Sequence, residues 1–321
     1  MKLLYEIGVK SPVELSYAKI TLKNLLRKNH KKEDESFLEH TLMELGVNLY
    51  KHANGGKIWI IETNGKIGIV ALDKGSGIEN ITWALKQGTS TIKNSLGVGL
   101  YSLTQNSEYS FHICSFTKNS SSFHGTVALL LPKDKKLHKT LFSLSFTKSG
   151  NGDFFAQKGR LYFFGDVAGH GLMAEKWAKI IIKNFYETTI SCFVVDSFYR
   201  QIHQKIQNED GRGFVGALIE ENQQIWNLCG IGNVTIFKND LKDVTIYRFQ
   251  DGVVGEAIRN IETKKIFRSN SKLIVTTDGI DDRSAYEILK KMPYDTDIRV
   301  TAISLIWFAG LNDDRSVLIL K

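Results

Sequence analysis

Short glycine-containing turns beside acidic residues occur in two ordered sets, which lie in different halves of this chain. The first set comprises Asp73-Lys-Gly-Ser-Gly77, Gly97-Val-Gly-Leu100 and Gly125-Thr126, preceded by Glu44 and Asn48. The second comprises Gly152-Asp153, Gly165-Asp-Val-Ala-Gly-His-Gly171, Thr277-Asp-Gly279 and Asp313-Asp314. Because 321 residues exceed one hydrophobic core of ordinary size, we expect two domains, each with one set.

A charged segment marks the expected boundary between them. Residues 132–139 read PKDKKLHK and follow the apolar run TVALLL. We therefore expect domains at residues 1–133 and 139–321. Both halves mix helical and strand patterns, which favours the α+β class.

The expected elements differ between the halves. In the first, residues 13–29 and 34–52 have apolar residues at helical spacing, and strands are expected at 57–63, 66–73, 109–117 and 123–131. In the second, strands are expected at 141–146, 153–158, 160–166, 213–220, 224–229, 233–238, 244–249 and 272–277. Helices are expected at 172–186, 192–207, 284–291 and 295–309. This predicts helices over one sheet in the first half, and two packed sheets flanked by helices in the second.

Charge and hydropathy exclude two classes of partner. Residues 1–138 carry 18 Lys and Arg against 12 Asp and Glu, and residues 139–321 carry 24 against 22, so the net charge of +8 is spread out. The sequence lacks the stripe of basic residues interleaved with aromatic residues that is typical of nucleic-acid binding. No apolar run reaches the roughly 18–20 residues that span a bilayer, and the N-terminus lacks a signal-peptide core. We expect a cytoplasmic protein without nucleic-acid or membrane partners.

The first set of motifs is typical of a site that binds a nucleoside triphosphate. Glu44 and Asn48 are four residues apart and therefore share a helix face. The Asn48 carbonyl can ligate Mg²⁺ beside phosphates, and Glu44 can accept a proton from a hydroxyl or water near the γ-phosphate. Asp73 can accept a hydrogen bond from an adenine amino group.

Glycines complete this predicted ATP pocket. Gly75 and Gly77 let the backbone approach the base closely. Gly97 and Gly99 would begin a helix whose free N–H groups meet the phosphates. A single Asp-x-Gly-x-Gly sequence is usually only a turn, so the prediction depends on the order and spacing of all the motifs.

The second set of motifs suits metal ions. Asp153, Asp166, Asp278 and Asp313 each adjoin an apolar strand or a tight turn that contains glycine. Converging carboxylates must be neutralised by metal, protons or basic groups. Two Mn²⁺ or Mg²⁺ ions bridged by a carboxylate could activate water and hold a phosphoryl group for in-line attack. The alternative is that these are four ordinary turn aspartates.

The first half resembles a known ATPase superfamily. The runs ELGVNLYKHA (44–53), DKGSGI (73–78) and GTSTIKNSLGVGL (88–100) are similar to those of GHKL ATPases, especially RsbT-type anti-sigma-factor serine kinases. The resemblance implies a two-layer α/β (Bergerat) sandwich with Glu44 as catalytic base and Asn48 as magnesium ligand. It also implies adenine contacts from Asp73 and Thr126. One departure is that Lys93-Asn-Ser95 stand where lid glycines are expected.

The second half resembles SpoIIE-like type-2C phosphatases, and in size the RsbX type. The runs SGNGD (149–153), GDVAGHG (165–171), GIGN (230–233), TDGI (277–280) and DDRS (313–316) occur in the family's order. The resemblance implies a four-layer αββα sandwich in which Asp166 bridges two metal ions. The Val167 carbonyl, Asp153, Asp278 and Asp313 complete the ligand set, with Asp314 as the alternative to Asp313.

Together, the two resemblances imply a bifunctional bacterial switch in sigma-factor regulation. The implied enzyme is a metal-dependent serine/threonine phosphatase that is also a serine kinase. It would act on STAS-domain anti-sigma antagonists or stressosome-type proteins and use ATP with Mg²⁺ or Mn²⁺. The alternative is that the first domain is a non-catalytic, ATP-dependent module that binds a partner and regulates the phosphatase.

Overall fold

The computed structural model describes all residues except 29–34, 88–98, 120–121, 148–149, 189–194 and 259. The chain divides into two compact units, Met1–Leu137 and His138–Lys321. This division falls inside the charged segment at residues 132–139. In the described part of the chain, no helix is both long enough and apolar enough to cross a membrane.

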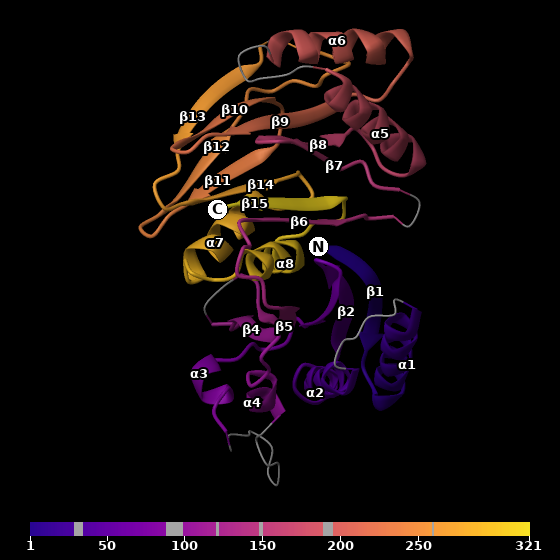
Figure 1. The fold of residues 1–321 in the computed structure, drawn as a ribbon, viewed down its shortest axis with the longest axis vertical. Coiled ribbons are helices and arrows are strands. Elements are labelled where there is room, and N and C mark those ends of the chain that lie inside the picture. Colours follow the sequence, from indigo (N-terminus) through magenta and orange to yellow (C-terminus); the bar gives the residue numbers. More distant parts are fainter. Residues whose placement is uncertain (29–34, 88–98, 120–121, 148–149, 189–194, 259) are drawn as a thin grey trace. The chain divides into compact units, whose positions relative to one another are not determined.

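The first unit is a five-stranded antiparallel sheet whose main helices pack on one face (Figure 1). The strand order is β1-β2-β3-β5-β4. The strands are β1 Lys2–Val9, β2 Gly56–Thr63, β3 Lys66–Leu72, β4 Tyr109–Phe116 and β5 Gly125–Pro132. The helices are α1 Pro12–Lys28, α2 Glu35–His52, α3 Ile81–Ala84 and α4 Gly99–Leu103. The α+β prediction is confirmed here; strand β1 was not predicted.

The core of this unit explains where α2 lies. Leu38, Leu42, Leu45 and Leu49 form one apolar side of the helix and are buried against alternate residues of the sheet, such as Ile60. Glu44 and Asn48 each precede one of these leucines by one position and are half-buried. The same packing that anchors α2 therefore holds its polar residues at the edge of the core.

The second unit has four layers, which Figure 1 shows as helices, sheet, sheet and helices. One sheet has the order β13-β10-β9-β8-β7 and the other β12-β11-β14-β15-β6. The strands are β6 Lys139–Leu144, β7 Phe154–Lys158, β8 Leu161–Val167, β9 Phe214–Glu221, β10 Ile225–Ile231, β11 Thr235–Asn239, β12 Val244–Arg248, β13 Glu262–Phe267, β14 Lys272–Thr276 and β15 Arg315–Leu320. The helices are α5 Leu172–Glu187, α6 Val195–Asn208, α7 Asp282–Lys291 and α8 Ile298–Phe308.

Two apolar cores hold these layers together. Along β8, Tyr162 and Phe164 face the second sheet, where they pack with residues such as Val275. Phe163 points the opposite way, into a core shared with α5 and α6. This alternation is the expected behaviour of a strand that is buried on both faces. The sheets and flanking helices agree with the layer order expected from the sequence.

Several boundaries differ from those expected. Helix α8 begins at Ile298 because the side chain of Asp297 caps it by accepting the Arg299 N–H; we had expected the helix from residue 295. Strands β13 and β15 were not predicted. Cys192, the expected start of the helix now seen as α6, lies outside the described residues.

Candidate functional site

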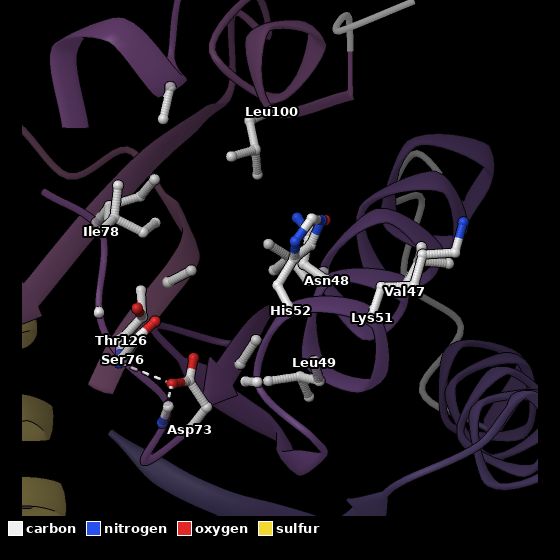
Figure 2. A pocket seen from close by; sticks show the side chains of 18 of the residues that line it. Val47, Asn48, Leu49, Lys51, His52, Asp73, Ser76, Ile78, Leu100 and Thr126 are labelled. Atoms are coloured by element: carbon white, nitrogen blue, oxygen red, sulfur yellow. Dashed lines mark hydrogen bonds between the residues drawn. The ribbon is translucent and has the colours of Figure 1, made fainter. Parts of the chain in front are cut away.

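The first unit contains a cavity of about 870 Å³ at the end of α2. That volume is within the range of small-molecule sites. The lining includes every residue predicted for the ATP pocket except Gly97, which lies outside the described residues: Glu44, Asn48, Asp73, Gly75, Gly77, Gly99 and Thr126. In Figure 2, Asn48 and His52 extend from α2 across the cavity from Asp73 and Thr126.

Asp73 is fixed at the floor of this cavity. It is 8% exposed, and its Oδ1 accepts hydrogen bonds from the N–H groups of Gly75 (2.8 Å) and Thr126 (3.1 Å). Burial raises the pKa of this carboxyl, and the two N–H donors together with His124 and Lys74 counteract the rise. Asp73 is thus held in one orientation as an acceptor.

Two glycines lie where neighbouring stretches of backbone approach closely beside Asp73. Gly77 has φ +80°, and a Cβ there would lie 2.2 Å from the Phe116 carbonyl oxygen. Gly125 has φ +126°, and its Cβ would lie 2.1 Å from the Asp73 carbonyl oxygen. Neither position has room for a side chain, so glycine is a steric requirement at both.

The opposite wall brings Glu44 to Gly99. A Cβ on Gly99 would lie 2.1 Å from Glu44 Oε2, so the carboxylate rests against the backbone at the start of α4. Apolar side chains such as Ile78, Leu100 and Ile113 also line the cavity, together with Lys51 and His52. Trp83, which sequence reasoning missed, also lines it and is 42% exposed. Such a cavity can take a flat ring beside Asp73 and an anionic group near α2.

The second unit brings the predicted aspartates to one end of its two sheets. Asp166 lies near the end of β8, and Asp153 directly precedes β7. Asp278 follows β14 and Asp313 precedes β15, both in the other sheet. The sheets are joined here because Thr277 Oγ1 donates to Asp153 Oδ2 at 3.2 Å. The four carboxylates are called the acidic cluster below.

The electrostatics of the acidic cluster favour a positive charge. Burial, followed by the negative charges of Asp153, Asp278 and Asp313, raises the pKa of Asp166 to about 9. Burial also raises the pKa of Asp153 to about 7, with further increases from Asp314 and Asp278. Asp153 Oδ1 is buried and has no hydrogen-bond partner among the described residues. Protons or cations must therefore neutralise this cluster.

A glycine keeps backbone oxygen close to the cluster. A Cβ on Gly152 would lie 2.9 Å from the Val167 carbonyl oxygen and 3.0 Å from Asp166 Oδ1. The predicted ligand atoms of Asp166 and Val167 are thus neighbours, and oxygen donors of this kind suit Mg²⁺ or Mn²⁺. Within the described residues, however, no three His, Cys, Asp or Glu side chains form a group that could hold a metal ion. Like charges repel, so unneutralised carboxylates in such a cluster stay apart.

Asp313 and Asp314 differ sharply in their surroundings. Asp314 is 3% exposed and accepts hydrogen bonds from the backbone N–H groups of Gly152 (2.8 Å) and Phe146 (2.6 Å). Its carboxylate therefore braces the loop between β6 and β7. Asp313 is exposed, and its charge contributes to the raised pKa of Asp166. This difference favours Asp313 as the ligand and gives Asp314 a structural role.

Comparison with known proteins gives only partial similarities. No family model matches the sequence, and no curated protein matches it. Among solved structures, RsbX in complex with magnesium is similar over 58% of this chain and 96% of its own, at 19% identity and TM-score 0.46. PppA of Pseudomonas aeruginosa covers 57% and 96% (11% identity, TM-score 0.49), and the Mycobacterium tuberculosis serine/threonine phosphatase PstP covers 56% and 96% (14%, 0.47).

These similarities cover little more than half of the chain and give no support to the ATPase resemblance of the first unit. All three TM-scores lie below 0.5.

Proposed function

We propose that the second unit is a metal-dependent serine/threonine protein phosphatase. The observation that carries this proposal is the acidic cluster, in which neighbouring carboxylates raise the pKa of the half-buried Asp166. Such a site has oxygen donors and excess negative charge, and it offers no serine or cysteine nucleophile among the predicted residues. Divalent ions bound there would supply activation of water and neutralisation of phosphoryl oxygens. Asp153, Asp166, Asp278, Asp313 and the Val167 carbonyl would hold them.

The first experiment tests this metal requirement on the full chain. Hydrolysis of p-nitrophenyl phosphate and of a phosphoserine peptide should require Mn²⁺ or Mg²⁺ and stop in EDTA. Asp166→Asn should abolish turnover because it removes a central anionic ligand. Asp196→Asn is the matched control, since Asp196 forms an exposed ion pair with Arg200 on α6. Full activity of wild type in EDTA, or of the Asp166 variant with Mn²⁺, would refute the phosphatase.

We further propose that the first unit binds ATP with magnesium. The supporting observation is the orientation of Asp73, whose Oδ1 is held by two N–H groups in a cavity that Asn48 and His52 face from α2. Asp73 would accept a hydrogen bond from the adenine amino group, and Asn48 would contribute the oxygen ligand for Mg²⁺. Glu44 would act as base if the unit transfers phosphate to a serine.

Calorimetry tests the nucleotide site. Asp73→Asn should weaken ATP binding about tenfold to a hundredfold, the loss of a hydrogen bond that involves a charged group. Asp134→Asn is the control, because Asp134 bonds Asn64 away from the cavity lining. Equal ATP affinity in wild type and Asp73→Asn would argue against this pocket.

The biological role we propose is a phosphorylation switch on STAS-domain or stressosome-type partners, an assignment that depends on the sequence resemblance. The competing role is an ATP-dependent binding module that regulates the phosphatase without phosphate transfer. Incubating a STAS-domain protein with the full chain and ATP–Mg²⁺, followed by intact-mass measurement, distinguishes them. A gain of one phosphate supports the kinase, and no gain despite ATP binding supports the binding module.

A further inference from the structure

Asp278, an exposed residue that follows β14, belongs to the acidic cluster. Its backbone is confined, because a Cβ on the next residue, Gly279, would lie 1.9 Å from the Asp314 carbonyl oxygen. Its side chain is exposed, and within the described residues its only hydrogen-bond donor is Asn233, with Nδ2 2.8 Å from Asp278 Oδ2. The hydrogen bond from Asn233 therefore orients the Asp278 carboxylate.

The chemistry of the contact fixes its polarity. An ionised carboxylate only accepts hydrogen bonds, so the NH₂ group of Asn233 must face it and the amide oxygen must point away. With Oδ2 engaged, Oδ1 is the oxygen left to act toward the cluster.

Asn233 is itself held by a rigid turn. The preceding Gly232 has φ +87°, its N–H donates to the Gln250 carbonyl at 2.9 Å, and a Cβ there would lie 2.3 Å from Val215 Cγ1. The following Val234 is fully buried between the two sheets. The turn therefore has little freedom on either side of Asn233.

The same strand relates this turn to Asp166. Val215, against which Gly232 packs, is the direct partner of Asp166 in the β8–β9 ladder. The turn that holds Asn233 therefore packs on the sheet that carries Asp166, while Asn233 itself bonds Asp278 of the other sheet. The positions of Asp166 and Asp278, the candidate ligands from the two sheets, are thus both related to Val215.

We propose that Asn233 is a positioning residue that presents Asp278 to the divalent cations of the acidic cluster; this rests on the proposed phosphatase function. By holding Oδ2, it removes the rotational freedom that an exposed aspartate would lose on binding a metal. Outer-shell partners of this kind typically change metal affinity about tenfold to a hundredfold.

The test measures Mn²⁺ affinity of the full chain by calorimetry without nucleotide. Asn233→Ala should weaken Mn²⁺ binding about tenfold to a hundredfold. Asn233→Asp, which keeps the volume but replaces the donor by a second acceptor, should weaken it at least as much. Asn184→Asp is the matched control, because the Asn184 amide donates to the Ile180 carbonyl on α5 (2.7 Å), and its affinity should equal that of wild type.

A second readout separates positioning from general damage. Thermal unfolding in EDTA should be the same for wild type and the Asn233 variants, since the contact lies on the surface. Phosphatase kcat of Asn233→Ala should approach wild type at saturating Mn²⁺, while the Mn²⁺ concentration for half-activity rises with the calorimetric Kd. Should the alanine variant unfold, the isosteric Asn233→Asp decides the question.

The possible outcomes distinguish failure of the Asn233 role from failure of the proposed phosphatase function. Wild-type Mn²⁺ affinity in both Asn233 variants, with affinity lost in Asp166→Asn, overturns the positioning role alone. Absence of Asp166-dependent Mn²⁺ binding in wild type overturns both the role and the phosphatase. Weaker binding in Asn233→Ala that is matched by Asn184→Asp would also overturn the specific role.

Discussion

The cavity of the first unit and the acidic cluster of the second each contain an aspartate with a raised pKa, and the groups around the two aspartates act on that pKa in opposite directions. Burial raises the pKa of both Asp73 and Asp166. Around Asp73, two backbone N–H donors oppose the rise, whereas around Asp166 neighbouring carboxylates add to it. Asp73, which accepts hydrogen bonds from N–H groups, is therefore suited to bind a neutral hydrogen-bond donor. Asp166, which is surrounded by like charges, is suited to bind a cation.

The largest effect should separate Asp313 from Asp314. Asp313→Asn should lower metal-dependent turnover about a thousandfold, equivalent to several kcal/mol of lost transition-state stabilisation, with folding retained. Asp314→Ala should instead lower the free energy of unfolding by roughly 2–5 kcal/mol, because it leaves the buried Gly152 N–H and the part-buried Phe146 N–H without their acceptor. Phosphatase assays and urea unfolding in EDTA measure the two effects. A stable, inactive Asp314 variant beside an active Asp313 variant would reverse the assignment.

The next effect concerns Glu44, which we propose as the base for phosphate transfer in the first unit. Glu44→Ala should reduce phosphate transfer to a protein serine about a hundredfold or more by removing the general base. ATP affinity should change little, because Asp73 and the backbone contacts remain. Autoradiography and calorimetry on the same preparation check this, with Glu108→Ala as a surface control. A large loss of ATP affinity would mean that Glu44 belongs to the binding wall.

The pH dependence of stability should expose the charge repulsion in the acidic cluster. Because the folded-state pKa of Asp166 lies above its ordinary value of 3.8, its contribution to stability is present at low pH and lost as pH rises through about 9. In EDTA the Tm should therefore fall by several degrees between pH 5 and 7.5, and Mn²⁺ should raise it most at the upper end.

Asp166→Asn is the control for this titration, and its Tm in EDTA should depend less on pH. The window ends at pH 7.5 because burial lowers the pKa of Lys272 to about 8, and its deprotonation would change stability with the opposite sign. Equal pH slopes in wild type and Asp166→Asn would contradict the electrostatic account.

The smallest predicted effect concerns one glycine at each site that has no room for a side chain. Gly125→Ala should destabilise the protein by about 1–3 kcal/mol, since its φ is +126° and the new Cβ meets the Asp73 carbonyl. Gly152→Ala should cost a similar amount and also weaken Mn²⁺ binding, because its Cβ meets Val167 oxygen and Asp166. Gly8→Ala is the control, with nothing within 4 Å of its Cβ. Urea unfolding of all three variants decides whether close packing or substitution alone is responsible.

Periodicity predicted much of the fold, and its failures have specific causes. The leucine spacing of α2 and the alternation along β8 were readable because one or both faces pack against a core. Strand β13 was missed because lysine and glutamate dominate it, as is common at sheet edges. Strand β15 was missed because a short apolar run has no alternation to distinguish strand from buried helix.

The identity of the candidate ligands follows from the sequence, since acidic residues beside glycine turns at strand ends are visible in one dimension. Asp73, Asp153, Asp166, Asp278 and the pair Asp313-Asp314 could all be named in this way. Only the tertiary structure separated Asp313 from Asp314, because that depends on which carboxylate accepts hydrogen bonds from backbone N–H groups of the loop before β7. Only it revealed that Asn233 bonds Asp278, 45 residues away, because that contact requires two strands of one sheet to end at the same point. Local sequence fixes which chemistry each turn can offer, whereas long-range packing decides which groups meet and which oxygen faces which.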